Sequence, residues 1–252
     1  MQEITLQQLA NIKERFLPDG PGPLIELHVL QTENGRSWVN RWPNPDVVLT
    51  ETAGNYSLVG QPDAIKPNAL RGLVKGFVAT SPTFVPLLQT AFPDLIVWER
   101  LIFAQTVAAE INPPPSGFDV RRVTLADEVA LLALGSEVSW VAKTWGGVMG
   151  MAASGTAWGA FGENGRLASL ACTFFVGHQY EEIGITTEPA FRGVGLSTAC
   201  SAAWCAAVAQ RGRIGSWTTA PENMASQRVA LKLGFRQHHR SFLYVIGINV
   251  PQ

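Results

Sequence analysis

Two glycines stand in a short turn that could hold a phosphate-bearing ligand. The turn reads Arg192-Gly193-Val194-Gly195-Leu196-Ser197 and lies between a segment with strand character and a segment of small residues with helix character. The first N–H groups of a helix lack partners inside the helix and carry the positive end of its dipole, so they bind phosphate oxygens well. Glycine turns also serve as plain connections, so this segment needs a second signal.

Two adjacent carboxylates, Glu181 and Glu182, precede the turn on a strand expected over residues 180–187. Successive strand side chains point to opposite faces, so only one of the two can face a substrate slot. A carboxylate in such a slot could remove a proton from an amine, which arrives protonated at neutral pH because its pKa is about 10.4. Each could equally be a solvated strand charge, as most Glu side chains are.

A second segment follows one helix and one strand later. It begins at Asn223, has Ser226 three residues on, and ends in Lys232-Leu233-Gly234-Phe235. The turn and this segment, in this order, resemble the two motifs of the GNAT acetyltransferase superfamily. The pyrophosphate motif there is Arg or Gln, two residues, Gly, one residue, and a small residue, which the stretch 192–197 matches.

The resemblance extends over residues 118–248. The strand that carries Glu182 and the strand that carries Trp217 further resemble the branch of zwittermicin-resistance-type acetyltransferases. The resemblance implies acetyl-CoA as cofactor, with its pyrophosphate on the backbone of the turn and its pantetheine arm between the end of the first strand and the second segment. The implied cofactor-binding residues are Ile185, Thr186, Thr187, Arg192, Gly193, Val194, Gly195, Leu196, Ser197, Asn223 and Ser226.

The resemblance also implies catalytic groups. Glu182 matches the strand pattern of the branch, whereas Glu181 matches the spacing of the superfamily's better-known base, and we favour Glu182. A backbone N–H near Thr186 or Thr187 is the natural donor to the acetyl oxygen. The implied activity is N-acetylation of a primary amine on a small molecule or amino-acid-like metabolite by direct attack.

The acid that protonates the departing thiolate is the point where this sequence departs from the superfamily. The usual Tyr falls at Ala230, so Ser226, Tyr244 or water would have to substitute, unless the thiolate leaves unassisted. This departure keeps a second function open, a catalytically weak acyl-CoA-binding protein with a regulatory or scaffold role. Thiol release with a mixed panel of amines separates the two functions.

The acceptor site is expected in the segment Ser136 to Met151. Trp140, Lys143 and Trp145 are candidates to line it, although packing in the core explains the aromatic residues equally well.

In the C-terminal half, sequence signals indicate the strands and helices that position these residues. Asn-Gly at 164–165 predicts a hairpin, and Thr124 with Asp127 predicts a capping box. The order is strand, helix, three antiparallel strands, helix, strand, helix, strand, which predicts a mixed, mostly antiparallel GNAT-like α/β sheet flanked by helices. The expected ranges are strands 118–123, 157–161, 166–176, 180–187, 214–218 and 242–248, and helices 124–134, 196–210 and 224–233.

The N-terminal half is expected to form a smaller α/β domain over residues 1–112, separated by the proline-rich stretch 112–117 from an acetyltransferase domain over 118–252. Its hairpin, helix and strand order suggests a divergent copy of the same fold. The expected ranges are helices 6–16, 69–78 and 83–91, and strands 47–52, 56–59 and 95–102.

The composition limits the classes of function and of binding partner that remain. The formal net charge of −1 gives no reason to expect a nucleic-acid or membrane partner. Three cysteines in apolar surroundings and four histidines without ligand spacing predict buried thiols and no metal site. With no signal peptide in Met1–Thr5, we expect a cytoplasmic protein, for which a homodimer is one arrangement. No glycine fingerprint follows the first strand of a βαβ unit, which argues against a Rossmann domain.

Overall fold

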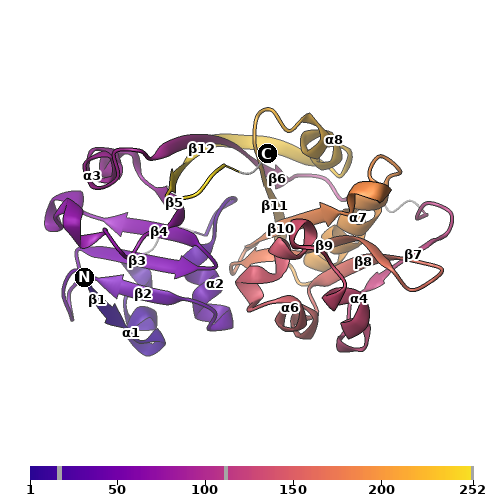
Figure 1. Cartoon of the computed structure of the whole chain (residues 1–252), viewed down its shortest axis with the longest axis horizontal. Helices are drawn as coiled ribbons and strands as arrows, with labels where there is room; N and C mark the ends of the chain where they lie inside the picture. The colour runs from indigo at the N-terminus through magenta and orange to yellow at the C-terminus, as the bar shows by residue number, and fades with distance from the viewer. Residues whose placement is uncertain (16–18, 111–112, 251–252) are drawn as a thin grey trace. The chain divides into compact units, whose positions relative to one another are not determined.

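The computed structural model describes residues 1–15, 19–110 and 113–250, and the chain forms two compact units (Figure 1). Unit 1 comprises Met1–Asp19, Ile25–Arg100 and Arg240–Gln252, and unit 2 comprises Gly20–Leu24 and Leu101–His239. Each unit is a sheet with helices on its faces, so the predicted α/β class is confirmed. No helix in the described ranges combines the length and the apolar character that a membrane span needs.

Unit 1 is built on the strand order β1-β2-β3-β4-β5-β12. Neighbouring strands are antiparallel except β4 and β5, which are parallel. The hairpin turn between β3 and β4 places Ala53 at φ 50° and Gly54 at φ 77°, the two positive values that a tight hairpin requires. Its elements are β1 (Gln2–Ile4), α1 (Leu6–Asn11), η1 (Lys13–Arg15), α2 (Ile25–Thr32), β2 (Arg36–Val39), β3 (Val47–Thr52), β4 (Asn55–Gly60), η2 (Pro62–Ala64), η3 (Pro67–Ala69), β5 (Gly76–Thr80), η4 (Pro82–Phe84) and α3 (Val85–Ala91).

The two faces of this sheet bury separate apolar cores. On one face Val48 and Val59 pack with Leu9 of α1 and Val29 of α2. The core on the other face holds Leu49, Leu58 and Val78 from the strands and Phe84 and Leu88 from the chain around α3. Alternating strand residues supply the two faces, as a sheet covered on both sides requires.

Unit 2 follows the strand order β6-β11-β10-β9-β8-β7. Its strands are antiparallel except for the pair β10 and β11. Its elements are β7 (Phe118–Arg122), η5 (Leu125–Asp127), α4 (Glu128–Leu132), α5 (Ser136–Ser139), η6 (Trp140–Trp145), α6 (Val148–Ser154), β8 (Ala157–Gly162), β9 (Leu167–Val176), β10 (Tyr180–Thr187), η7 (Pro189–Phe191), α7 (Leu196–Gln210), β11 (Ile214–Thr219) and α8 (Met224–Lys232), with β6 (Ile96–Gln105) and β12 (Phe235–Ile246) divided between the units.

Helix α7 covers one face of this sheet, and Figure 1 shows it along strands β8 to β10. Trp204 and Cys200 of α7 pack there on Trp217 and Phe235. The other face is covered by α4, η6 and α6, whose Leu131, Val141 and Met151 pack on β8 and β9. The predicted capping box is confirmed, because the Thr124 N–H donates to Asp127 Oδ2 at 2.8 Å.

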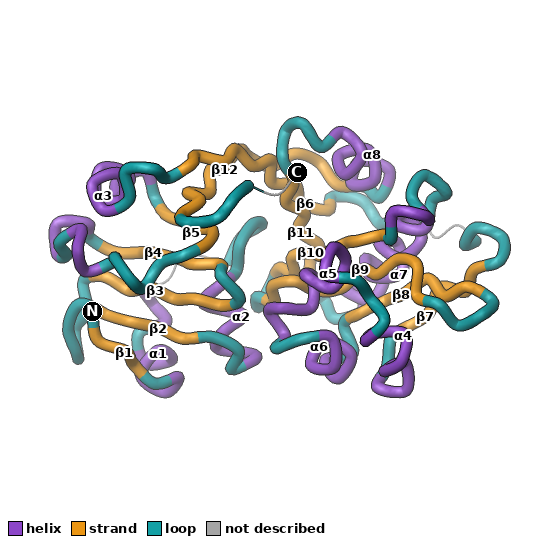
Figure 2. The backbone as a smooth tube through the Cα atoms, viewed as in Figure 1, coloured by secondary structure: helices purple, strands orange, loops and turns teal. Residues whose placement is uncertain are grey.

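The units do not follow a single cut in the sequence. Residues 101–104 of β6 pair with β11 in unit 2, and residues 243–246 of β12 pair with β5 in unit 1 (Figure 2). Each unit therefore contains a strand segment that the other half of the sequence supplies. The predicted boundary at 112 falls on a residue outside the described ranges, and the domain limits stay a prediction.

Three expected elements differ from the structure. Residues 69–78 do not form a helix: η3 ends at Ala69, Gly72 and Gly76 have positive φ, and β5 begins at Gly76. The last strand runs from Phe235 to Ile246 instead of 242–248. The first helix is α1 followed by η1, and its expected end at Phe16 lies outside the described residues. The expected strands 180–187 and 47–52 and the helix 196–210 match the structure.

Candidate active site

Strands β10 and β11 pair over three residues and then separate, and we call the point of separation the fork. The parallel ladder joins residues 180–182 to residues 214–216, and its last pair is Glu182 with Ser216. Past this pair, β10 keeps β9 as its partner through Thr187, and β11 keeps β6 through Thr219. Within these described strands, the two facing edges beyond Glu182 and Ser216 carry backbone groups without a ladder partner. An extended polar ligand can pair with such an edge as an added strand does.

The glycine turn leads from β10 into α7 with two residues of positive φ. Gly193 has φ +83° and Gly195 has φ +95°, values that residues with a side chain adopt at a cost. Gly195 is the N-cap of the 15-residue helix α7, so the first amides of that helix open onto an exposed turn. A Cβ on Gly193 would meet no heavy atom within 4 Å, which leaves the space above the turn open. We call this turn and the first amides of α7 the cradle. Its positive electrostatic potential and its open space both suit a diphosphate.

Arg192 and Ser169 hold the strand end that leads into the turn. Arg192 Nε donates to Thr187 O at 3.1 Å, and Ser169 Oγ donates to Thr186 O at 3.0 Å. Ser169 Oγ also lies 2.7 Å from Thr187 Oγ1. Ser169 thus holds Thr186 and Thr187 from the β9 side, and Arg192 holds the Thr187 carbonyl from the turn.

Glu181 is fully buried on the α7 face of the sheet. Arg211 donates to both carboxylate oxygens at 2.8 Å, Arg213 donates at 3.0 Å, and Thr173 Oγ1 donates as well. Burial alone would raise the pKa of Glu181, but these hydrogen bonds together hold that pKa below its ordinary value. A carboxylate held by two guanidinium groups is a weak proton acceptor, so this geometry favours structure over catalysis for Glu181.

Glu182 lies on the opposite face of β10 because successive strand residues alternate. The β9–β10 register shifts between Glu182 and Ile183, which leaves Phe174 of β9 as the extra residue of a bulge. Across the ladder the neighbour of Glu182 is Ser216. Glu182 therefore stands at the point where β10 and β11 diverge, on the face that η6 covers.

Close to Glu182, Trp140 and Val141 of η6 and Phe174 of β9 cover one face of β10, and we call these three side chains the aromatic wall. A Cβ on Gly184 would lie 3.3 Å from Phe174 Cβ and from Val141 Cβ, so both side chains reach the bare strand there. The Trp140 ring packs edge-on against Phe174, with centroids 5.4 Å apart. Of the expected acceptor residues, Trp140 is thus placed at the site. Trp145 is tied down elsewhere, since its Nε1 donates to Thr173 O at 2.5 Å, and Lys143 is exposed.

The predicted residues of the second segment hold α8 in place. Asn223 is the N-cap of α8, and its Oδ1 accepts from the Ser226 N–H at 3.0 Å. Ser226 Oγ accepts from Trp217 Nε1 at 2.9 Å. This chain of bonds fixes the start of α8 against β11, on the side of the fork across from the glycine turn.

The structure offers no acid at the usual position, and it removes one of the candidate replacements. Ala230 is fully buried in the core against α7. Tyr244 is buried in the core of unit 1, opposite Val78, and is not one of the residues of unit 2. The prediction that Tyr244 could protonate the departing thiolate is therefore wrong. Water or Ser226 remains as the candidate acid.

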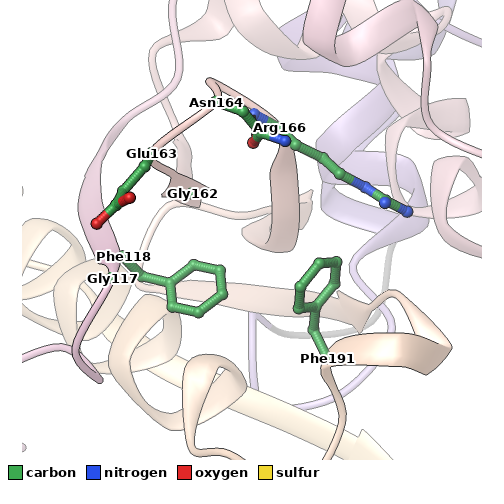
Figure 3. A pocket seen from close by; sticks show the side chains of 7 residues that line it. All are labelled: Gly117, Phe118, Gly162, Glu163, Asn164, Arg166 and Phe191. Atoms are coloured by element: carbon green, nitrogen blue, oxygen red, sulfur yellow. Dashed lines mark hydrogen bonds between the residues drawn. The ribbon is translucent and has the colours of Figure 1, made fainter.

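A groove lies at the other edge of unit 2 (Figure 3). Phe118 and Phe191 face each other across it, with centroids 5.7 Å apart, and the Arg166 guanidinium lies 5.1 Å from the Phe191 ring. The groove adjoins the glycine turn through Phe191, but its other residues come from β7 and the β8–β9 hairpin. Its lining consists of Gly117, Phe118, Gly162, Glu163, Asn164, Arg166 and Phe191. Strands β8 and β9 separate it from the fork.

Sequence reasoning missed several residues around the fork. Gly22 donates its N–H to Ser216 Oγ at 2.9 Å, although 194 residues separate them. Arg211 and Arg213 sit just after α7, and only the parallel register of β10 and β11 brings them to Glu181. No local motif signals such pairs. The β10–β11 register would have been the signal to use.

The cysteines behave as expected from their apolar surroundings. All three are free and buried, and burial raises the pKa of Cys200 and of Cys205 to about 12. Burial also raises the pKa of the Cys172 thiol. A nucleophilic thiolate is thus disfavoured at each position.

Comparison with known proteins points to one family. The family description "GNAT acetyltransferase" matches residues 120–244. An uncharacterized N-acetyltransferase from the mutA 5' region of Streptomyces virginiae is 36% identical over 197 residues, which cover 78% of this chain and 83% of that protein.

Solved structures share the fold over nearly the whole chain. A GCN5-related N-acetyltransferase-like protein from Streptococcus suis has a TM-score of 0.73 at 19% identity and covers 95% of this chain and 98% of its own. A tandem GNAT protein from the clavulanic acid biosynthesis pathway has a TM-score of 0.55 at 15% identity, with 95% of this chain and 92% of that chain covered.

Proposed function

The chain belongs to the GNAT acetyltransferase family, and from this premise we propose that unit 2 transfers an acetyl group from acetyl-CoA to a primary amine of a small molecule or amino-acid-like metabolite. The carrying observation is the fork of β10 and β11 with the glycine turn at its open end. Acetyl-CoA supplies the thioester. The backbone of residues 192–197 holds the pyrophosphate, and the edge of residues 185–187 that faces β11 pairs with the pantetheine arm. Asn223 and Ser226 flank that arm from α8.

In this mechanism Glu182 removes the proton from the amine, directly or through one water. The amine nitrogen then forms a bond to the acetyl carbon, and the bond from that carbon to sulfur breaks. A backbone N–H near Thr186 or Thr187 donates to the acetyl oxygen while negative charge develops on it. The thiolate takes a proton from water, since the position of the usual acid is occupied by Ala230.

Acetyl-CoA binding tests the proposed cradle. Gly195→Glu places a carboxylate and a strained φ where the pyrophosphate would lie, and we expect the affinity for acetyl-CoA to fall by at least about 100-fold by calorimetry. Gly212→Glu is the matched control, because Gly212 follows the other end of α7, has φ +69° and has no heavy atom near its Cβ position. Retained binding in the Gly195 variant would refute the placement of the phosphates.

The alternative function is a catalytically weak acyl-CoA-binding protein. The buried Ala230 at the acid position is the observation that favours it. Thiol release from acetyl-CoA with a panel of primary amines discriminates the two. Release that depends on an amine supports the transferase, whereas tight binding of acetyl-CoA without release supports the alternative.

We also propose that unit 1 is a divergent copy that has lost its cofactor site. Both units have a parallel pair after three antiparallel strands, β4 with β5 and β10 with β11. In unit 1 the connection between the parallel strands, residues 61–75, contains only η2 and η3 in place of a helix like α7. Calorimetry should therefore give one acetyl-CoA per chain, and a stoichiometry of two would contradict the proposal.

We place the reaction in the cytoplasm. Three buried free thiols suit a reducing compartment.

A further inference from the structure

A short segment from the N-terminal part of the sequence belongs to unit 2. Residues Gly20–Leu24 cluster with unit 2, although the residues on either side belong to unit 1. Gly22 is buried, and its N–H donates to Ser216 Oγ at 2.9 Å. A Cβ on Gly22 would lie 3.7 Å from Ile102 Cδ1 of β6. The segment is therefore packed on the sheet at β6 and β11.

The contact with Ser216 brings this segment beside Glu182. Ser216 and Glu182 are direct partners in the parallel ladder, so their side chains stand on the same face, on strands about 4.8 Å apart. Gly215, the neighbour of Ser216, has Trp204 and Phe235 against it on the α7 face, which confirms that Ser216 points the other way. The Pro21-Gly22-Pro23 backbone thus lies over the face that carries Glu182.

The opposite flank of Glu182 is the aromatic wall. Phe174 and Val141 contact the bare strand at Gly184, and Trp140 packs on Phe174. Glu182 and Gly184 are two residues apart on one strand and so share this face. The residues named on the two flanks of the carboxylate, those of the aromatic wall and those of the Pro21–Pro23 segment, are uncharged.

We propose that these two walls form the acceptor slot and that the slot selects a primary amine carried on an uncharged aromatic or aliphatic body. This inference rests on the proposed acetyl transfer. The ammonium group would approach Glu182, and the apolar body would lie between Trp140 and the two prolines. An acceptor with several positive charges would have to leave charge unpaired against apolar walls, which disfavours it.

Ser216 is then a positioning residue. Its hydroxyl accepts from Gly22 and fixes the distance between the proline segment and the strand that carries Glu182. It needs no contact with the amine. Loss of the hydroxyl frees the segment and loosens the slot, which alters binding of the acceptor and leaves the cradle at the glycine turn intact.

The experiment measures acceptor kinetics and acetyl-CoA affinity separately. The probes are phenethylamine and n-hexylamine as apolar amines and spermidine as the polycation, assayed by thiol release. The variants are Ser216→Ala and the double variant Pro21→Ala with Pro23→Ala, which relaxes the backbone of the segment and changes no strand residue. Ser154→Ala is the matched control, since Ser154 Oγ also accepts from a backbone N–H, that of Thr156, at the end of α6.

We expect the apolar amines to be acetylated with kcat/KM at least about tenfold above spermidine. Both slot variants should raise KM for the apolar amines by about fivefold or more, with the acetyl-CoA Kd within about twofold of the parent protein. The control should leave both values unchanged.

Two results would overturn the inference. One is preference for spermidine, or acetylation of spermidine with no acetylation of either apolar amine. The other is an unchanged KM in the double proline variant. Failure of the proposed function is seen differently, as no thiol release with any amine or no binding of acetyl-CoA by the unmodified chain.

Discussion

The guanidinium group of Arg211 binds Glu181 through both carboxylate oxygens, with Nε and one terminal nitrogen each 2.8 Å away. The next residue along β10, Glu182, faces the other side of the sheet at the fork. Strand alternation thus places two neighbouring glutamates on opposite faces of the sheet and in different surroundings. Glu181 fastens the end of α7 to the sheet, whereas Glu182 lies at the fork, where we propose that it acts as the base.

Glu181→Gln should destabilise the protein without directly removing a catalytic group. The change leaves Arg211 and Arg213 without their carboxylate, and because both are about a quarter exposed we expect a loss of about 2 kcal/mol in the free energy of unfolding at pH 7. The folded pKa of Glu181 is lowered, so its stabilisation is present above the unfolded pKa and disappears as pH falls through the folded pKa. Urea unfolding at pH 7 and pH 4 should show the parent and the variant converging at the lower pH.

Glu182→Gln should reduce acetyl transfer while acetyl-CoA affinity is retained. General-base catalysis contributes about 10²–10⁴-fold, and the loss should be largest at low pH, where little free amine exists without a base. The pH–rate profile of kcat/KM for the amine checks this. Glu163→Gln, on the exposed β8–β9 turn, is the control. An unchanged profile in the Glu182 variant would assign the proton transfer to water.

Ala230→Tyr should not restore the acid that the family usually places there. Ala230 is completely buried among the side chains of α7 and β11, so a phenol would overpack this core and lower stability by about 3 kcal/mol. Thermal unfolding and thiol release measured side by side test this expectation. A variant with faster release and an unchanged Tm would contradict it.

Glu26→Gln should stabilise unit 1 at high pH. Burial raises the pKa of Glu26 on α2, and the hydrogen bond from Ser57 of β4 opposes that rise only in part. Such an acid contributes stability below its unfolded pKa, and the contribution is lost as pH rises through the folded pKa. Unfolding free energies at pH 5 and pH 8 should diverge in favour of the variant at pH 8. A constant difference between the two pH values would show that Glu26 titrates normally.

Local signals in the sequence were sufficient for most elements of unit 2. The Asn-Gly hairpin, the capping box at Thr124 and the limits of α7 are each set by neighbouring residues, so a pattern can reveal them. Residues 69–78 failed as a helix because Gly72 and Gly76 adopt positive φ, which apolar periodicity does not report.

Long-range pairing accounts for what the sequence did not reveal. The placement of β6 beside β11, the reach of β12 to β5, and the Gly22–Ser216 bond depend on strand register across more than a hundred residues. The same limit applies to the candidate base. Local spacing proposed both Glu181 and Glu182, and only the position of Arg211 after folding distinguishes them.

The reach of β12 to β5 affects the order of events during synthesis. Until residues 243–246 have been synthesised, β5 has its neighbour β4 but lacks the strand that pairs with its other edge. The strands of unit 1 that come early in the sequence therefore keep an open hydrogen-bonding edge until this segment has emerged. A chain that stops before residue 243 would present that edge to other chains, which makes the strand at 243–246 a safeguard against aggregation.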